Sequence, residues 1–586
     1  MKKIITIISE KVSQAFAACG YDAAYGAVSV SNRPDLCQYQ CNGALTAAKQ
    51  FHKAPIVIAE EIAAALSGED LFSLCEAVKP GFINISLNTA FLARYVYEMS
   101  RSEKFGMEPA GEPQTIVVDY GGPNVAKALH VGHLRPAIIG EAVKRILRYA
   151  GNEVIGDAHL GDWGLQIGLI ITELRVRQPE LPYFDESFAG EYPKEPPFTM
   201  SDLEEIYPYA SEYSKTHEDY KEAARHATYL LQNGHRGYRA LWEHIMTVSM
   251  NDLKKNYKKL NVEFDLWKKE SDAQPYIPEM IQKMKDEGHA HISEGALVVD
   301  VKEESDTKEI PPCMILKSDG ATLYNTTDLA TIVERMKLFS PNQIIYVVDK
   351  RQSLYFEQIF RCARKTHLVN EDTKLTFLGF GTMNGRDGKP FKTRDGGVMR
   401  LEQLVQSIVD EVYEKMKDRD MPEEEIRRVA GQVGLAALKY GDLSNQASKD
   451  YIFDVERFTS FEGNTGPYIL YTMVRIKSIL GRLDGAEASM PEPSKRSYGT
   501  EETNWLLTLS RFADTVERAA AELAPHKLCQ YIYELANVFN SFYHGNKILT
   551  EADEAKKAEW IGLLQTTLAV LQTCIDLLAF EAPDRM

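Results

Sequence analysis

The sequence predicts a multidomain α/β protein, in which a central domain built on a parallel sheet follows a small α+β domain and precedes an all-helical bundle. Length is the first observation, because 586 residues exceed what a single hydrophobic core usually holds. The second is a set of continuous apolar runs after residue 113, typical of strands buried on both faces. The third is the nearly uninterrupted helical patterning that follows residue 400.

Residues 1–108 form the predicted N-terminal domain. Helical patterns at 42–51 and 56–68 precede a glycine turn and the strand pattern "KPGFINISL" at 79–87. The chain begins with two lysines and a short apolar run, as signal peptides do. Charged residues such as Glu10 break that run, so we expect an amphipathic first helix instead.

Residues 109–420 form the predicted central domain. A strand pattern at 114–120, a helix pattern at 133–149 and a strand pattern at 152–160 make the strand–helix–strand unit of a parallel sheet. More strands of this kind are expected at 295–301, 343–349 and 374–382. The segment from about 169 to 290 is strongly helical with charged faces, and we expect it to be an insertion into the sheet domain.

Residues 421–586 form the predicted helical bundle, in which the Pro-, Ser- and Gly-rich stretch 484–500 joins two helices. The net charge of −17 disfavours nonspecific coating of nucleic acid, although a local patch can still bind phosphates. Eight cysteines are scattered without zinc-ligand spacing or a disulfide framework, which indicates free thiols in a reducing cytoplasm. No run approaches 18 apolar residues, so no transmembrane helix is expected.

The motif "HVGH" places His130 and His133 where the first strand of the sheet turns into a helix. A helix N-terminus at the end of a parallel strand attracts anions, and imidazole N–H groups there can follow phosphate oxygens as charge builds. Gly132 between them lets a flat ligand approach the backbone. Two alternatives remain at this point, because His-x-x-His is also a metal-ligand spacing and two histidines can simply cap a helix.

A second basic element, "GRDGKPFKTRDGG", follows the strand pattern of 374–382. The glycines around Lys389, Lys392 and Thr393 predict a loop whose ammonium groups can reach a polyphosphate. Neither G-x-G-x-x-G after the strand nor a Walker A sequence is present, so the familiar phosphate loops are excluded.

Together, "HVGH" on an early strand–helix turn and a lysine loop after a late strand resemble the two halves of a class I aminoacyl-tRNA synthetase. The strings "GGPNVAKALHVGHLRPAIIG", "LGDWGLQIG", "FEGNTGPYILY" and "EAPDRM" resemble the arginyl-tRNA synthetase family in particular, from the N-terminal domain to the last residue. The resemblance implies a Rossmann-like catalytic domain, an N-terminal domain that touches the outer corner of tRNA, and a C-terminal anticodon-binding bundle. It also implies arginine activation by ATP and transfer to tRNA(Arg).

The resemblance assigns the ATP site to His130, His133 and Gly132, together with Lys389, Lys392 and Thr393 of the loop. Pro390 and Phe391 stand where the family usually has Met-Ser, so the loop departs from the family's pattern next to Lys389. Lys127, just before the histidine motif, is therefore expected to share the phosphate role with Lys392. The resemblance implies that Mg²⁺ is bound by ATP, and we expect no metal ion held by protein side chains.

The resemblance assigns the arginine pocket to Asn124, Tyr324, Asp328 and Gln352. Tyr324 and Asp328 are four residues apart, hence on one face of a helix, and a carboxylate is the natural partner of a guanidinium. In isolation, an aspartate on a helix face more often only caps or solvates the helix. Tyr355 is left out, because the family usually has histidine there.

For tRNA, the resemblance suggests Phe82 and Asn84 in the N-terminal domain and Tyr471 and Met586 in the bundle. The alternative for Phe82 is a plain core residue. We expect a monomer that binds tRNA, arginine and ATP and neither DNA nor membranes. Rival interpretations are a class I synthetase for another amino acid, a small-molecule adenylyltransferase, and a synthetase-like RNA-binding protein without catalysis.

Overall fold

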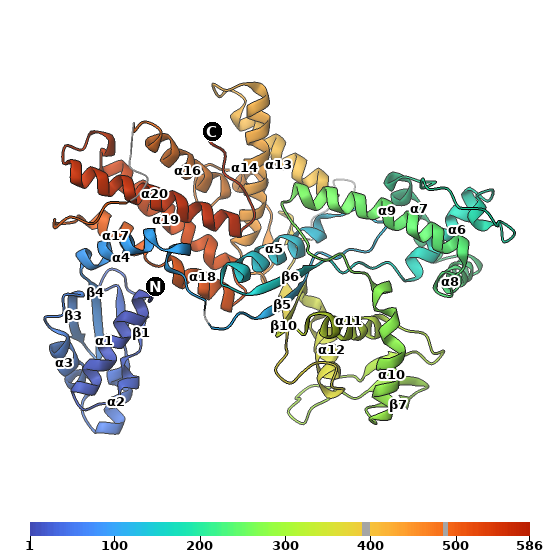
Figure 1. The fold of residues 1–586 in the computed structure, drawn as a ribbon, viewed down its shortest axis with the longest axis horizontal. Coiled ribbons are helices and arrows are strands. Elements are labelled where there is room, and N and C mark those ends of the chain that lie inside the picture. The colour runs from blue at the N-terminus through green and yellow to red at the C-terminus, as the bar shows by residue number, and fades with distance from the viewer. Residues whose placement is uncertain (110, 390–398, 484–489) are drawn as a thin grey trace.

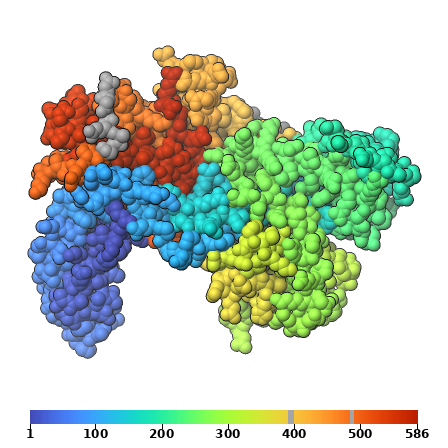
Figure 2. All heavy atoms as spheres, in the orientation of Figure 1, coloured from blue at the N-terminus to red at the C-terminus, as the bar shows by residue number. Residues whose placement is uncertain are grey.

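The computed structural model describes residues 1–109, 111–389, 399–483 and 490–586. Figure 1 shows an elongated molecule with the N-terminal domain (blue) at one end, the helices of the insertion (green) at the other, and the C-terminal helices (orange to red) over the central sheet. In Figure 2 the N-terminal domain and the yellow-green part that holds α11 and α12 project as separate lobes, with an open recess between them.

The N-terminal domain is an antiparallel sheet of order β1-β2-β4-β3 covered by helices. Its strands are β1 (Val28–Val30), β2 (Tyr39–Cys41), β3 (Phe72–Val78) and β4 (Phe82–Leu87). Its helices are α1 (Ile4–Ala18), α2 (Gly43–Phe51) and α3 (Pro55–Leu66). Ile4, Ile8 and Val12 recur every four residues on α1 and are buried, so the first helix is a core helix of the domain. α4 (Thr89–Arg101) leads from this sheet to the catalytic part.

The central sheet is parallel and four-stranded, with the order β11-β10-β5-β6. Its strands are β5 (Thr115–Asp119), β6 (Glu153–Asp157), β10 (Gln343–Asp349) and β11 (Lys374–Phe380). α5 (Leu134–Tyr149) connects β5 to β6, and α12 (Ser353–Lys365) connects β10 to β11. The chain runs outward from β5 in one direction and from β10 in the other, so a ligand crevice is expected at the carboxyl ends of these two neighbours.

The prediction that 295–301 adds a strand to the parallel sheet is wrong. β8 (Ala296–Val299) pairs antiparallel with β7 (Ala290–Ser293) and β9 (Cys313–Leu316) in a separate sheet. Its apolar residues pack into the core that α10 (Ile277–Asp286) and α11 (Tyr324–Phe339) share. A short apolar run carries no information about its pairing partner, which is why sequence could not separate the two sheets.

The helical segment between β6 and β7 contains α6 (Leu165–Arg177), α7 (Met200–Tyr213), α8 (Glu218–Gln232) and α9 (Arg236–Lys259), followed by α10. After the sheet come α13 (Leu401–Met416), α14 (Glu423–Leu443), the short α15 (Val455–Phe458), α16 (Gly466–Leu480), α17 (Thr500–Leu509), α18 (Phe512–Ala521), α19 (Pro525–Gly545) and α20 (Glu554–Leu577). α20 is long and apolar enough to cross a membrane by composition alone, contrary to the sequence expectation. Its most apolar window is 61% buried, and α20 packs against α16, α19 and α5 as a core helix of the bundle.

A buried arginine links helix α11 to the sheet. Nη2 of Arg335 lies 2.6 Å from Asp119 and 2.7 Å from Asp157, the last residues of β5 and β6. The guanidinium is 2% exposed and lies over the ring of Tyr346 on β10, 5.5 Å from its centroid. This one side chain therefore joins α11 to the carboxyl ends of β5 and β6 and to the ring of Tyr346 on β10.

We predict that Arg335→Met destabilises the parallel-sheet domain by about 3–5 kcal/mol, because it leaves two carboxylates without their buried partner. The measurement is urea unfolding, followed at the transition of that domain. Lys337→Met is the matched control, because Lys337 lies on the same helix and its pair with Glu279 is exposed, so it should cost less than about 1 kcal/mol. Equal effects of the two substitutions would contradict the assignment.

Candidate active site

The two histidines of the motif form a hydrogen-bonded pair after β5. The backbone N–H of His130 donates to Nδ1 of His133 at 3.1 Å, and the N–H of Gly132 donates to Nδ1 of His130 at 3.0 Å. The ring centroids are 3.9 Å apart. Because each Nδ1 accepts, each neutral ring must carry its proton on Nε2. The motif therefore presents two N–H donors of defined tautomer at the start of α5.

Burial keeps both rings uncharged. Removal from water lowers the pKa of His133 to about 3, and the neighbouring His130 and Lys127 act in the same direction. Burial and Lys127 also lower the pKa of His130. Both histidines are thus neutral hydrogen-bond donors near pH 7 rather than cations.

Gly132 is required by the motif itself. A Cβ atom at this position would lie 2.8 Å from Cε1 of His130, closer than nonbonded carbon atoms approach. From the sequence, this glycine is expected to let a ligand lie against the backbone. The structure adds an internal reason, since any side chain here would displace the first histidine ring.

The lysine loop begins in a tight turn that contacts β13 (Tyr451–Ile452) and the start of α15. The N–H of Gly385 donates to the carbonyl of Lys389 at 2.8 Å, and β12 (Met383–Asn384) pairs with β13. Nη2 of Arg386 lies 2.9 Å from Asp454 at the start of α15. Lys392 and Thr393, with Pro390 and Phe391, lie outside the described residues.

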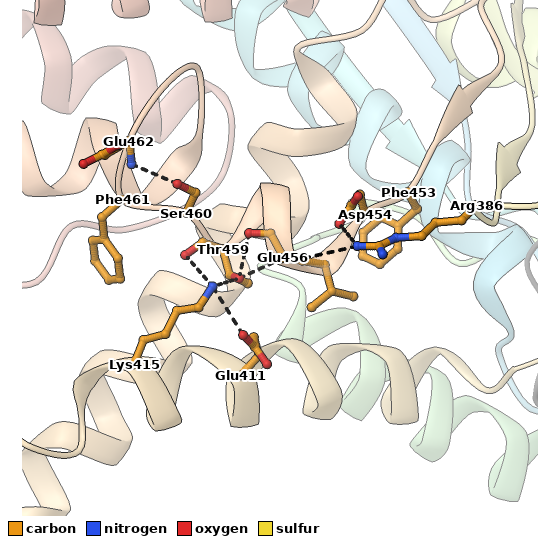
Figure 3. A pocket seen from close by; sticks show the side chains of 11 residues that line it. Arg386, Glu411, Lys415, Phe453, Asp454, Glu456, Thr459, Ser460, Phe461 and Glu462 are labelled. Atoms are coloured by element: carbon orange, nitrogen blue, oxygen red, sulfur yellow. Dashed lines mark hydrogen bonds and ion pairs between the residues drawn. The ribbon is translucent and has the colours of Figure 1, made fainter.

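Figure 3 shows the surface beside this turn. A cavity of about 850 Å³ lies between α13 and the segment around α15, with Arg386 at one end and Lys415 on its wall. Nζ of Lys415 donates to Oγ1 of Thr459 at 2.6 Å. None of the predicted site residues lines the cavity, whose charged side chains pair mainly with one another. Its contacts fix the start of the lysine loop rather than forming the reaction centre.

The far end of the loop returns to the histidine motif. The N–H of Val131 donates to the carbonyl of Met399 at 3.0 Å, and the N–H of Leu401 donates to the carbonyl of Leu129 at 2.9 Å. Lys127 and His130 line one cavity of about 170 Å³ with Arg400, which pairs with Glu204 of α7. Arg400 is a cation that sequence analysis missed, because nothing in the sequence shows that residue 400 pairs with residue 130.

The predicted side-chain pocket lies at the start of α11. Tyr324 is 67% exposed, whereas Asp328 is largely removed from water, which raises the pKa of its carboxyl. The hydroxyl of Tyr355 donates to Oδ2 of Asp328 at 2.5 Å and opposes that rise. Tyr355, which sequence analysis left out, therefore holds the pocket carboxylate in place.

A second carboxylate, that of Glu270, interacts electrostatically with Asp328. Burial, Asp162 and Asp328 together raise the pKa of Glu270 to about 7. Glu270 begins the 3₁₀ turn Glu270–Tyr276, and its N–H donates to the carbonyl of Leu160 beyond β6. The pKa of Tyr324 is raised mainly by burial and further by the nearby carboxyl of Glu270. No motif marks Glu270 in the sequence, and a raised pKa in a crevice is the signal that finds it.

Asn124 and Gln352 lie at the same edge of the sheet. Asn124 is exposed in the loop after β5, and a Cβ at Gly161 would meet its Oδ1 at 2.1 Å. Gln352 ends the turn Lys350–Gln352 after β10 and is exposed. The parallel topology thus brings residues from three strand ends to one crevice, as the order of the sheet predicts.

The described residues contain no group of three or more His, Cys, Asp or Glu side chains placed to hold a metal ion. His130 and His133 bond to the backbone through Nδ1, and no carboxylate joins them in the hydrogen bonds that the structure shows. Because each Nδ1 accepts a backbone N–H, both rings keep an Nε2–H donor, which the anion-binding interpretation requires.

The residues expected to meet RNA lie far from this crevice along the chain. Phe82 is partly exposed at the start of β4, whereas Asn84 is 3% exposed and accepts a hydrogen bond from Gln40 at 2.9 Å. Asn84 is therefore better placed to orient Gln40 than to reach a large ligand directly.

In the bundle, Tyr471 and Met586 are both partly exposed. The guanidinium of Arg475 lies 4.9 Å from the ring centroid of Tyr471 and 5.3 Å from that of Tyr543. This array of two rings and a cation, on α16 and α19, is a surface on which unpaired bases can stack. Tyr471 was predicted from the sequence and stays a prediction, whereas its neighbours Arg475 and Tyr543 were not predicted, because residues on two helices meet only after folding.

A parallel sheet with neutral histidines at its switch point and a lysine loop that returns to pair with them defines the catalytic domain of a class I aminoacyl-tRNA synthetase. Residues 98–455 match the model for tRNA synthetases class I (R), catalytic domain, and residues 469–586 match the DALR anticodon binding domain. Residues 2–87 match the arginyl tRNA synthetase N terminal domain. The chain belongs to the arginyl-tRNA synthetase family.

Relatives of known identity agree along the whole chain. The chain is 60% identical over 597 residues to an arginine–tRNA ligase of Agathobacter rectalis and 56% identical over 587 residues to that of Alkaliphilus oremlandii, with all of both chains covered in each case. The fold is similar to that of the arginyl-tRNA synthetase of Plasmodium falciparum, with a TM-score of 0.83 at 24% identity and full coverage of both chains. The Thermus thermophilus enzyme gives a TM-score of 0.79 at 23% identity, also with full coverage.

We predict that His133→Asn slows adenylate formation by about 10²-fold or more, the usual loss of one donor to a developing charge. The Asn amide oxygen can still accept from the His130 N–H, but the variant has no group at the place of Nε2, so folding and arginine KM should change little. Pyrophosphate exchange measures the effect, and His291→Asn, on an exposed strand residue, is the matched control. Normal turnover in His133→Asn would mean that Nε2 has no role.

Proposed function

We propose that this chain joins L-arginine to its cognate tRNA, through an arginyl-adenylate and at the expense of ATP. The observation that carries the proposal is the pair of partly buried carboxylates, Asp328 and Glu270, at the edge of the sheet that also holds the histidine motif. A guanidinium is a planar cation with five donors, and two carboxylates in a site shielded from water complement it. The family membership supports the same substrate.

The residues of the crevice divide the work between binding and charge stabilisation. Asp328, held by Tyr355, and Glu270 receive the guanidinium, with Tyr324 beside them. Asn124 holds the α-amino and carboxylate end of arginine, and Gln352 is a further donor in the pocket. The arginine carboxylate then attacks the α-phosphorus of ATP, an oxygen–phosphorus bond forms, and the bond to pyrophosphate breaks. No covalent bond to the protein is needed, because positioning supplies the reactive geometry.

The cationic and N–H donor groups lie where negative charge develops. Nε2–H of His130 and of His133 can donate to phosphate oxygens more strongly as their charge increases. Lys127 lies beside His130 in the same cavity, and we assign the leaving pyrophosphate to Lys127 and Lys392, with Lys389 and Thr393 contributing from the loop. Mg²⁺ would travel with the triphosphate and neutralise it, since nucleotide oxygens can supply ligands that the described side chains do not.

The ends of the molecule would hold the tRNA. We assign the anticodon to Tyr471, Arg475, Tyr543 and Met586, and the outer corner of the tRNA to Phe82, with Asn84 acting through Gln40. We further propose a cytoplasmic monomer that engages neither DNA nor membranes. α20 is consistent with this, because the bundle uses its apolar face as core.

The proposal predicts arginine-dependent pyrophosphate exchange in the presence of tRNA, and loss of that activity in Asp328→Asn. Removing one charge of such a pair costs about 3–5 kcal/mol, so the arginine KM should rise by roughly 10²–10⁴-fold while ATP affinity stays within a few-fold. Asp372→Asn, at an exposed residue, is the matched control. Exchange supported by another amino acid in preference to arginine, or none with all twenty, would sink the proposal.

Glu270 predicts a pH dependence. With a pKa of about 7 in the free enzyme, Glu270 is mostly protonated at pH 6 and mostly ionised at pH 8, and only the ionised form attracts a guanidinium. The arginine KM should therefore fall roughly tenfold as pH rises from 6 to 8, following the ionised fraction. Glu270→Gln should raise KM and flatten the profile. A profile that is equally steep in Glu270→Gln would assign the titration to another group.

A further inference from the structure

Ala126 has an unfavourable backbone conformation between two substrate-binding residues. Its φ is +57°, in the left-handed region that residues with a Cβ rarely adopt, and the residue is fully buried. It lies between Asn124 and Lys127, so its peptide orientation decides where both side chains point. Strained backbone of this kind persists only when surrounding groups enforce it, and it is common at functional sites.

Helix α9 supplies that enforcement. Oγ of Ser249, a side chain only 1% exposed, accepts the N–H of Ala126 at 2.8 Å. Two turns further along the helix, the hydroxyl of Tyr257 donates to the carbonyl of Gly121 at the start of the same loop. Both ends of the segment from Gly121 to Ala126 are therefore held by one rigid helix of the insertion. The N–H of Ala126 is buried, so losing its acceptor would favour a rotated peptide that finds another.

We propose that Ser249 is a positioning residue for adenylate formation, which keeps Ala126 in its left-handed conformation and so orients Asn124 toward arginine and Lys127 toward phosphate. The inference rests on the proposed function of those two side chains. Ser249 itself touches neither substrate, because it is buried beneath the loop. The insertion thereby contributes to catalysis through the conformation of a backbone segment about 120 residues earlier in the chain.

The test compares Ser249→Ala with wild type in arginine- and tRNA-dependent pyrophosphate exchange, below the unfolding temperature of both. We expect kcat to fall about tenfold and the KM values for arginine and ATP to rise several-fold. A purely structural loss would lower the active fraction, and hence kcat, but would leave both KM values unchanged. Thr247→Ala is the matched control, since this hydroxyl on the same helix is exposed and bonds only to its own helix at Glu243.

A second substitution separates strain from lost packing. Glycine adopts positive φ without strain, so Ala126→Gly should restore a substantial part of the activity of Ser249→Ala. Ser249→Cys, which keeps the volume but is a weaker acceptor, should give intermediate KM values and serves if the alanine variant does not fold. Unchanged KM values in both Ser249 variants, or no recovery with Ala126→Gly, would overturn the inference. An inactive wild type would instead refute the proposed function.

Discussion

The contact of Arg335 with Asp119 and Asp157 is the interaction on which the geometry of the crevice depends. Two carboxylates at neighbouring parallel strand ends would repel each other in a buried site. The guanidinium neutralises both and in doing so fixes the rotation of α11 about its axis. Asp328 lies seven residues earlier, two turns along the same helix, and so faces the same edge of the sheet. A structural ion pair therefore sets the direction of the pocket carboxylate.

A second buried arginine ties the histidine motif to the C-terminal helices. Arg135, two residues after His133, pairs with Asp442 of α14 at 3.0 Å and donates to the carbonyls of Gly381 and Lys449. Lys439, one helical turn earlier on α14, donates to the carbonyl of Ala579 at 2.6 Å and to that of Leu260 at the end of α9. Lys439 thus joins the catalytic part to Ala579, which lies within the residues that match the anticodon binding domain, through a buried polar contact.

Burial disfavours the charged form of the titratable side chains in the crevice, so a ligand of opposite charge is needed to stabilise that form. The histidines are uncharged because burial and the nearby Lys127 disfavour their protonated forms, and the pKa of Glu270 is raised to about 7 because burial and the carboxylates of Asp162 and Asp328 disfavour its ionised form. An incoming guanidinium provides that opposite charge for Glu270 and Asp328. The site is therefore poised to bind a positively charged side chain, and a neutral amino acid would leave two carboxylates close together in a site with little water.

Local patterns in the sequence are enough to predict the helices and strands and the short motifs of the site. The strand–helix–strand unit, the histidine motif, the helical spacing of Tyr324 and Asp328, and the family could all be predicted, because each depends on neighbours along the chain. Other features appear only in the tertiary structure. They are the antiparallel pairing of β8, the interactions of Tyr355 and Glu270 with Asp328, the pairing of Arg400 with His130, and the hydrogen bond from Ala126 to Ser249. Each of these is a contact between segments far apart in sequence, and its partner is chosen by packing, burial and the need to satisfy buried polar groups, none of which leaves a periodic trace in one chain.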